Sequence, residues 1–315
     1  MSDEFLVAGV DGGGSKTECA IVDQDGHVVG VGRGGPSNLV YTRLPAVLEA
    51  FGAAVQSATA GLSGHTRVAL TACTHRAGSH PDVQALLTRM LGGEVRRYTE
   101  GEAALGCAGI FERFGIAHIA GTGASTFGFS RDGREIMVGG WGMLVGDEGG
   151  GYDIAVSGLR AAVRAMDGRG PHTSLLERAC RHFGLATQRE AFIGFSITAE
   201  RHVVASFAPE VTAAAREGDH AAEKIVEDAV REHADSILAV AGRLFGPDEV
   251  FPVALHGGVM SERGIAKEVA RLVRERFPKA DVRLQVHSPG VGLALFALWD
   301  VRAAAGRQLP HEEAV

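Results

Sequence analysis

The sequence has few cysteines, no excess of basic charge and no long apolar run. The four cysteines are far apart and show no paired spacing, so we expect neither a disulfide framework nor a zinc site; they are Cys19, Cys73, Cys107 and Cys180. The formal net charge of −7 argues against nucleic acid as a partner. No apolar run reaches the roughly 18 residues of a membrane-spanning helix. The residues Met1–Glu4 are acidic where a signal peptide is basic, so we expect a cytoplasmic protein without a membrane partner.

Glycine, by contrast, is abundant. The chain has 44 glycines in 315 residues, about twice the usual share of roughly 7%. They cluster in short runs, which suggests that the backbone is kept bare so that a ligand can approach it. Hydrophobic residues make up 45% and charged residues 22%, the balance of a globular protein, and the length suits two domains.

Alternating apolar segments predict strands and helices in turn. In the first part we expect strands over Phe5–Val10, Cys19–Val22, His27–Val31, Val68–Cys73 and Glu94–Tyr98, and helices over 43–60, 81–91 and Glu102–Phe111. Later we expect strands over Ile116–Ala120, Thr126–Phe129, Ile136–Val138, Val250–Leu255 and Val282–Val286, a helical region over 153–245, and helices over 261–277 and Gly292–Ala304.

At Ile116 the pattern of the N-terminus begins again. Both blocks read as strand, glycine turn, strand, Asp-Gly hairpin and strand. This predicts an α/β fold in two copies, each with a mainly parallel sheet and an antiparallel hairpin at one edge. The alternative is a chance repetition of two Asp-Gly hairpins.

The first strand leads into a turn suited to phosphate. The turn consists of Asp11, Gly12, Gly13, Gly14, Ser15, Lys16 and Thr17. Backbone N–H groups of the glycines can point into one concavity, where the hydroxyls of Ser15 and Thr17 and the charge of Lys16 add to the attraction. Asp11, at the end of the strand, is placed to hold hydrated Mg²⁺. The spacing fits neither a Walker loop nor a Rossmann turn, and a tight hairpin that needs glycine is the alternative.

A second turn of the same chemistry opens the second block. It consists of Gly121, Thr122, Gly123, Ala124 and Ser125. Two such turns in similar blocks are more specific than one. Together they could grip a triphosphate from both sides of a cleft.

Two further glycine segments follow. Trp141 stands among the glycines of 139–142, and sugars pack their C–H faces on such an indole ring. Asp147 and Glu148 come between a glycine and a predicted helix, so a helix cap is their alternative role. His256-Gly257-Gly258 ends a strand, where a flat ring could lie against bare backbone; a plain strand-to-helix turn is the alternative.

These motifs, in this order, resemble the N-acetylglucosamine kinase family of the BadF/BadG/BcrA/BcrD-type ATPases, within the acetate/sugar kinase–Hsp70–actin fold. The resemblance implies two actin-like (ribonuclease H-like) βββαβα domains over 1–115 and 116–315, with a helical insertion around 153–245 and a cleft between the domains. It also implies ATP and Mg²⁺ as cofactors, and a homodimer.

The resemblance also implies roles for individual residues. For ATP they are Ser15 and Thr122 at the phosphates and Gly257 and Gly258 at the adenosine. For the sugar they are Asn38, Ala124, Ser125, Gly140, Trp141, Gly142 and Asp147. The family usually has Ser-Asn or a similar pair where this chain has Ala124-Ser125.

The catalytic base of that family is an Asp at the end of a strand. Here Glu100, one methylene longer, falls on that position, so the resemblance implies Glu100 as the base and a ligand of the sugar. The alternative is that Glu100 caps the helix that begins near Glu102. Glu102 is a weaker rival for the base, because we expect it to face solvent or the helix dipole.

The function that follows is ATP-dependent phosphorylation of an amino sugar, N-acetylglucosamine or glucosamine, at O6. The alternative is a BadF-type nucleotide-binding ATPase or regulator without sugar kinase activity. A reductase-activating ATPase is disfavoured because the chain has no cysteine pair suited to an iron–sulfur cluster.

Overall fold

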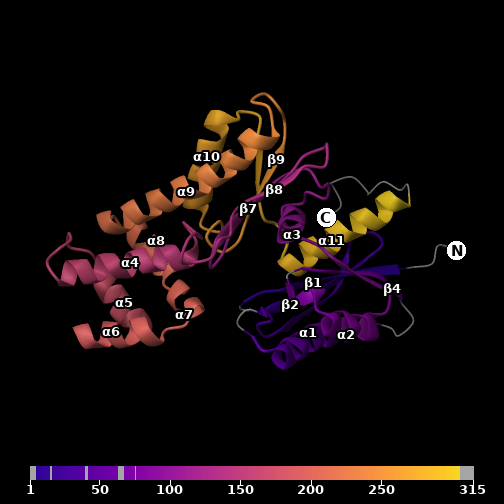
Figure 1. The fold of residues 1–315 in the computed structure, drawn as a ribbon, viewed down its shortest axis with the longest axis horizontal. Helices are drawn as coiled ribbons and strands as arrows, with labels where there is room; N and C mark the ends of the chain where they lie inside the picture. Colours follow the sequence, from indigo (N-terminus) through magenta and orange to yellow (C-terminus); the bar gives the residue numbers. More distant parts are fainter. Residues whose placement is uncertain (1–4, 15, 40–41, 63–66, 75, 306–315) are drawn as a thin grey trace. The chain divides into compact units, whose positions relative to one another are not determined.

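The computed structural model describes residues 5–14, 16–39, 42–62, 67–74 and 76–305. The chain forms two compact α/β units (Figure 1). The first contains the described residues up to Ala117 and those from Gln285 onward, and the second is His118–Leu284. The sequence-based division at 115/116 differs from this in two respects: the boundary lies between Ala117 and His118, and the C-terminal segment belongs to the first unit, not to the second.

The first unit has a five-stranded mixed sheet in the order β3-β2-β1-β4-β5. Its strands are β1 (Phe5–Gly12), β2 (Thr17–Asp23), β3 (Val28–Gly34), β4 (Arg67–Cys73) and β5 (Glu94–Arg97). The strands β1, β4 and β5 run parallel, whereas β2 and β3 form the antiparallel edge that the Asp25-Gly26 hairpin predicted. The carboxyl ends of the three parallel strands therefore lie at one edge of the sheet.

Helices cover this sheet on both faces, as the burial of β1 requires. They are α1 (Leu44–Thr59), α2 (Pro81–Leu91), α3 (Glu100–Cys107) and α11 (Pro289–Ala304), with the short 3₁₀ helix η1 (Arg76–Ser79) before α2. Leu6, Ala8 and Val10 of β1 share a core with Phe51 of α1. Because side chains alternate along a strand, Gly9 points to the opposite face, where α11 lies.

The helix α11 approaches the first sheet so closely that only glycine is possible at the contact. A Cβ atom on Gly9 would lie 2.3 Å from the carbonyl oxygen of Gly290, and one on Gly106 of α3 would lie 2.1 Å from that of Gly292. The buried carboxylate of Glu18, on β2, accepts a hydrogen bond (3.2 Å) from the backbone N–H of Gly290 at the start of α11. These contacts place the C-terminal helix in the first unit.

The second unit repeats the strand order of the first. Its sheet, β8-β7-β6-β9-β10, consists of β6 (Gly115–Ala120), β7 (Ala124–Phe129), β8 (Glu135–Gly139), β9 (Pro252–His256) and β10 (Asp281–Leu284). The correspondence of β6–β10 with β1–β5 confirms the predicted duplication of architecture. That the two phosphate-type turns face one another across a cleft stays a prediction.

The predicted helical region between β8 and β9 is confirmed. It comprises α4 (Gly151–Met166), α5 (Leu175–Phe183), α6 (Arg189–Thr198), α7 (Arg201–Ala205), α8 (Ala208–Arg216) and α9 (His220–Leu244), and α10 (Arg263–Arg276) follows β9. Asp219 caps α9 by accepting hydrogen bonds from the backbone N–H groups of Ala221 and Ala222.

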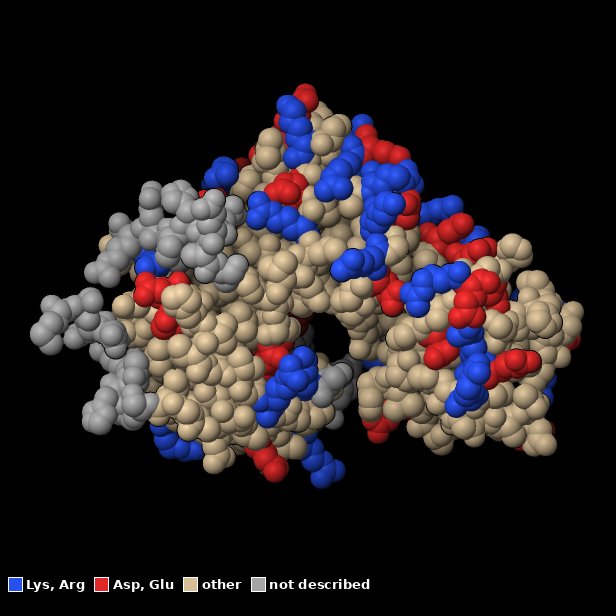
Figure 2. All heavy atoms as spheres, turned by 180° about the vertical axis from the view of Figure 1, so that it is seen from behind, with Lys and Arg blue, Asp and Glu red and all other residues tan. Residues whose placement is uncertain are grey.

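Basic and acidic side chains alternate over the helices of the second unit, as Figure 2 shows. Many form pairs within one helix, such as Lys224 with Asp228 on α9 and Arg271 with Glu268 on α10. Such exposed pairs contribute only about 0–1 kcal/mol each to the free energy of unfolding. Within the described ranges, the helices lack the combination of length and apolar character needed to span a bilayer.

We expect Gly9→Ala to lower the free energy of unfolding by about 1–3 kcal/mol, because the new methyl group meets a backbone oxygen that cannot rotate away. The control is Gly52→Ala in α1, where nothing lies within 4 Å of the new Cβ and the change should stabilise the helix by roughly 0.5–1 kcal/mol. Chemical denaturation measures both. A Gly9→Ala protein as stable as wild type would contradict the packing described for α11.

Candidate functional site

Three polar residues lie near one another at the carboxyl edge of the first sheet. Asp11 lies near the end of β1, Thr74 directly follows β4, and Glu100 follows β5. The hydroxyl of Thr74 donates a hydrogen bond to Oδ1 of Asp11. Sequence reasoning missed Thr74, although its position one residue past a buried strand was a usable signal.

Glu100 is the first residue of α3 and is an exposed residue, although protein surrounds much of its carboxyl group. Desolvation by the surrounding protein raises its pKa above the ordinary value, the negative charge of Asp11 raises the pKa further, and Arg97 lowers it in part. Glu100 does not cap the helix. Thr99 is the N-cap, and its hydroxyl accepts a hydrogen bond from the backbone N–H of Glu102.

Glu102 is the partner in this capping box. Its side chain is only 2% exposed, and Oε2 accepts hydrogen bonds from the backbone N–H (2.6 Å) and the hydroxyl (2.8 Å) of Thr99. Its other oxygen pairs with Arg113. Of the two expected positions for Glu102, solvent is wrong and the helix dipole is right: the capping box holds its carboxylate at the start of α3 and Arg113 pairs with it, which leaves Glu100 as the accessible carboxylate.

In the first glycine turn, neither packing nor backbone angle requires a glycine at Gly13 or Gly14. A Cβ atom on Gly14 would meet nothing within 4 Å, one on Gly13 would make only an ordinary contact, and neither residue has a positive φ. Gly12 differs, since its Cβ would lie 2.6 Å from Oγ of Ser37. The space around Gly13 and Gly14 supports the expectation that the backbone of this turn is left bare for a ligand. Ser15 lies outside the described residues.

Thr17 and Lys16 have protein partners. The buried hydroxyl of Thr17 lies 2.8 Å from the carbonyl oxygen of Gly35 and 2.7 Å from Oγ of Ser37, so it does not face a phosphate as expected. It instead ties the turn to the segment that carries the half-buried Asn38. The ammonium of Lys16 is 52% exposed and lies 3.5 Å from Oε2 of Glu18.

In the second unit, two glycine turns lie side by side at the sheet edge. The carbonyl oxygen of Gly121 accepts a hydrogen bond from the backbone N–H of Gly151 (2.8 Å), and that of Thr122 accepts one from Tyr152 (3.0 Å), so the turn adjoins the start of α4. Gly257 has φ +106°, and its Cβ would lie 2.3 Å from the carbonyl oxygen of Ala120. Gly258 beside it has open space at its Cβ position.

Asp147 has a positive φ of +63°, and no other non-glycine among the described residues has a positive φ. Its buried carboxylate pairs with Arg201 and lies against Gly123, whose Cβ would be 2.3 Å from Oδ2. It does not cap α4, whose N-cap is Gly150. Sequence reasoning missed Arg201, because nothing in the sequence links two residues that are 54 positions apart.

The Trp141 segment lies beside the strand that carries Ala124 and Ser125. The backbone N–H of Gly140 donates to the carbonyl oxygen of Ala124 (2.9 Å), and both Gly140 and Gly142 have positive φ angles. The side chain of Trp141 is 77% exposed. An indole ring held outside the core beside polar backbone suits the packing of a sugar face.

A buried chain of polar side chains, which sequence reasoning missed, supports this region. Oγ1 of Thr126 lies 2.8 Å from Nδ1 of His118, and Nε2 of His118 lies 3.0 Å from Nδ1 of His233. A Cβ on Gly149 would lie 2.9 Å from Nε2 of His233, so the chain ends at the loop that holds Asp147. Burial lowers the pKa of His118 well below its usual range and that of His233 to about 4.

No group of three or more His, Cys, Asp or Glu side chains within the described ranges is arranged to hold a metal ion by itself. Mg²⁺ does not require such a group, because it usually takes one or two protein carboxylates and completes its shell with water and substrate phosphates. Asp11, held by Thr74 beside the open glycines, has the chemistry for that role.

The two five-stranded units define the chain as an actin-like α/β protein. The structure is similar to a Streptomyces griseus ROK family glucokinase in complex with glucose and AMPPNP (TM-score 0.61, 18% identity, 92% of this chain and 98% of that chain). Residues 8–297 match the BadF/BadG/BcrA/BcrD ATPase family, and the chain belongs to this family.

Several proteins named as sugar kinases are similar over nearly the whole chain. One is the N-acetylmuramic acid/N-acetylglucosamine kinase of Clostridium acetobutylicum (28% identity, 92% of this chain, 97% of that protein). Another is the N-acetyl-D-glucosamine kinase of Dictyostelium discoideum (29% identity, 95% and 99%). A Chromobacterium violaceum structure, provisionally named an N-acetylglucosamine kinase, has a TM-score of 0.71 at 25% identity (93% and 98%).

We expect the free energy of unfolding to fall as the pH decreases from about 7 to about 5. His118 and His233 are neutral in the folded protein, whereas the unfolded chain takes up protons below its ordinary histidine pKa of about 6.5. His233→Gln should be less stable at neutral pH but should show a flatter pH dependence. Denaturant titrations across this range measure both, and an equal slope in the two proteins would contradict the assignment.

Proposed function

We propose that this chain is a kinase that transfers the γ-phosphoryl group of ATP to an amino sugar, N-acetylglucosamine or glucosamine, at O6. The observation that carries the proposal is that Asp11, Thr74 and Glu100 lie near one another at one sheet edge. One carboxylate there is fixed by a hydroxyl and the other is accessible with a raised pKa. The family and the named relatives support the same reaction.

For ATP, the candidates are the bare turns of both units. Gly13 and Gly14 in the first unit and Gly121–Gly123 in the second present backbone to phosphate oxygens, and Gly257-Gly258 presents it to the adenosine. The start of α4, which adjoins the second turn, adds the positive end of a helix dipole. Asp11 would hold Mg²⁺ through bound water, and the ion would neutralise charge on the phosphates.

For the sugar, the candidates are Asn38 and the region of Trp141. The indole ring packs on the apolar face of the ring, and polar groups of Ala124, Ser125, Gly140, Gly142 and Asp147 bind its hydroxyls. Asp147 can accept such a hydrogen bond while Arg201 remains on its Oδ2. These assignments come from the resemblance, and the local clustering of the glycines with Ala124 and Ser125 supports them.

Glu100 acts as the general base in this proposal. As the O6 oxygen attacks the γ-phosphorus, Glu100 accepts the O6 proton, the bond to the β-phosphate oxygen breaks, and ADP leaves. A base works best when its pKa is near the working pH. Desolvation and the charge of Asp11 both shift the pKa of Glu100 in that direction.

We expect Glu100→Gln to lower kcat by about 10²–10⁴-fold while ATP binding is kept, because only charge and proton acceptance are lost. Glu100→Asp, which shortens the arm by one methylene, should keep part of the activity. ADP release with glucosamine, N-acetylglucosamine and N-acetylmuramic acid measures turnover, and calorimetry measures ATP binding.

The matched control is Glu102→Gln. It keeps an oxygen that can accept in the capping box but removes the negative charge that pairs with Arg113, so it should lower the Tm while leaving kcat of the folded fraction near wild type. Full activity of Glu100→Gln would rule out Glu100 as the base. ATP binding without turnover on any sugar of the panel, in the wild-type protein, would favour the nucleotide-binding regulator instead.

We expect Trp141→Ala to raise the KM for the sugar roughly tenfold, because the ring face is lost. The KM for ATP should stay unchanged, since the glycine turns are untouched. Steady-state kinetics with each substrate varied in turn separates the two constants. If both KM values remained at the wild-type level, the exposed indole would have no part in sugar binding.

A further inference from the structure

The helical region of the second unit contains a cavity of about 240 Å³, apart from the residues assigned above. It lies between α4, the segment Gly170-Pro171 and the start of α9, and its lining includes Ser157, Arg160, Arg164, Pro171, Ala221 and Ile225. Arg160 is about 13 Å along α4 from the glycine turn at Gly151, at the usual helical rise of ~1.5 Å per residue. Nothing in the proposed kinase reaction uses this cavity.

Two arginines beside the cavity have no counter-charge. Arg160 and Arg164 are one turn apart on α4, an arrangement in which like charges destabilise a helix. Across the described part of the chain, neither forms an ion pair with a carboxylate; Arg164 donates only to the carbonyl oxygen of Arg169 (3.0 Å). The carboxylate of Asp167 is already taken by Arg169 and Arg189. The cavity therefore has two positive charges available to an anion.

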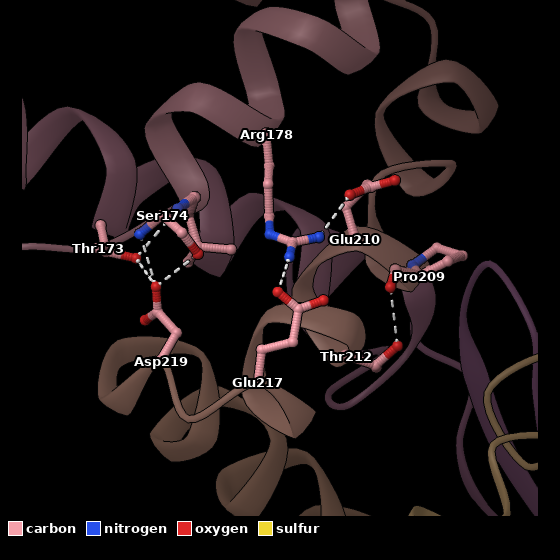
Figure 3. Close-up of polar contacts among 9 residues, drawn as sticks. Thr173, Ser174, Arg178, Pro209, Glu210, Thr212, Glu217 and Asp219 are labelled. Carbon is pink, nitrogen blue, oxygen red and sulfur yellow. Dashed lines mark hydrogen bonds and ion pairs between the residues drawn. The ribbon is translucent and has the colours of Figure 1, made fainter.

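Hydrogen bonds of Asp219, which Figure 3 shows, hold together two segments next to the cavity lining. Oδ2 of Asp219 accepts hydrogen bonds from the hydroxyl of Thr173 (2.8 Å) and from the backbone N–H (2.6 Å) and hydroxyl (2.9 Å) of Ser174. Its Oδ1 caps α9 at the same time. Asp219 thus joins the segment after Pro171 to the helix start at Ala221, so the cavity is formed without a ligand.

Ion pairs reinforce the neighbouring helices. Arg178 of α5 binds Glu210 of α8 (2.9 Å) and Glu217 (Figure 3). These acidic side chains are therefore occupied by Arg178. Arg160 and Arg164 line the cavity and are exposed.

We propose that this cavity binds a small molecule bearing a phosphate monoester. The dianion matches two guanidinium groups, which can each bind phosphate oxygens through two N–H donors, and the hydroxyl of Ser157 adds a further donor. The apolar wall formed by Pro171, Ala221 and Ile225 contacts the carbon skeleton. The volume is below the ~300–1,000 Å³ of larger ligand sites, which favours a sugar phosphate over a nucleotide.

The test is calorimetric titration of the intact chain without ATP, with glucosamine 6-phosphate, inorganic phosphate and glucosamine as separate probes. We expect Arg160→Gln/Arg164→Gln to bind glucosamine 6-phosphate at least tenfold more weakly than wild type and to bind glucosamine unchanged. The matched control is Arg181→Gln, an exposed arginine on α5 outside the cavity, which should bind all probes as wild type does. Both arginines of the cavity are exposed, and circular dichroism checks that the double variant is folded.

The outcomes separate this site from the kinase site. Equal binding of glucosamine 6-phosphate by wild type and the double variant would place the phosphate elsewhere and overturn the proposal, as would the absence of saturable binding of both phosphate probes. If inorganic phosphate bound as tightly as the ester, with the same loss in the double variant, the site would stand with the free anion as its ligand. None of these results depends on turnover, so a failure of the proposed kinase activity remains distinguishable.

Discussion

The first unit depends on one close approach, the contact of the α11 backbone with β1 and α3. Gly9 and Gly106 have no side chain, and a Cβ on either would meet a carbonyl oxygen of Gly290 or Gly292 within 2.3 Å. The same helix therefore rests on the strand that ends near Asp11 and on the helix that begins with Glu100. The buried Glu18 adds an electrostatic tie, because its carboxylate binds the N–H of Gly290 at the positive end of α11. Packing far from the chemistry thus sets the positions of both carboxylates.

Two glutamates two residues apart illustrate how local structure divides roles that the sequence leaves ambiguous. Glu102 is the N3 residue of α3, so the capping box with Thr99 turns it inward, where Arg113 neutralises it. Glu100 is at N1 of the same helix and is an exposed residue. Desolvation by the surrounding protein raises the pKa of Glu100, and the negative charge of Asp11 raises it further. A carboxylate beside another carboxylate is a better proton acceptor near neutral pH than an isolated one.

Most elements could be predicted because apolar periodicity and glycine punctuation are local signals. The strands and helices lie close to their expected bounds, and the Asp-Gly hairpins revealed the duplication. The placement of α11 could not be predicted, since it depends on close contacts between residues far apart in the sequence, such as Gly9 and Gly290. The partners of Thr17 could not be predicted either. The sequence shows a hydroxyl in a phosphate-type turn, but it does not show that this hydroxyl contacts Ser37 and Gly35. The contact of Arg201 with Asp147 and that of His118 with His233 could not be predicted for the same reason, because the spacing of these residues in the sequence gives no signal.

The ion pair with Arg201 allows the carboxylate of Asp147 to lie beside the glycine turn at Gly123. A left-handed backbone at a non-glycine residue costs of order 1–3 kcal/mol, and such strain tends to persist where function requires it. Here it directs a carboxylate against Gly123, in the turn that we assign to phosphate, where an unpaired negative charge would repel the nucleotide. Arg201 cancels that charge, and its guanidinium also lies over the ring of Tyr152, 5.9 Å from the ring centre. Asp147 can therefore lie beside a phosphate turn and still offer an oxygen to a neutral hydroxyl, as the proposed sugar site requires.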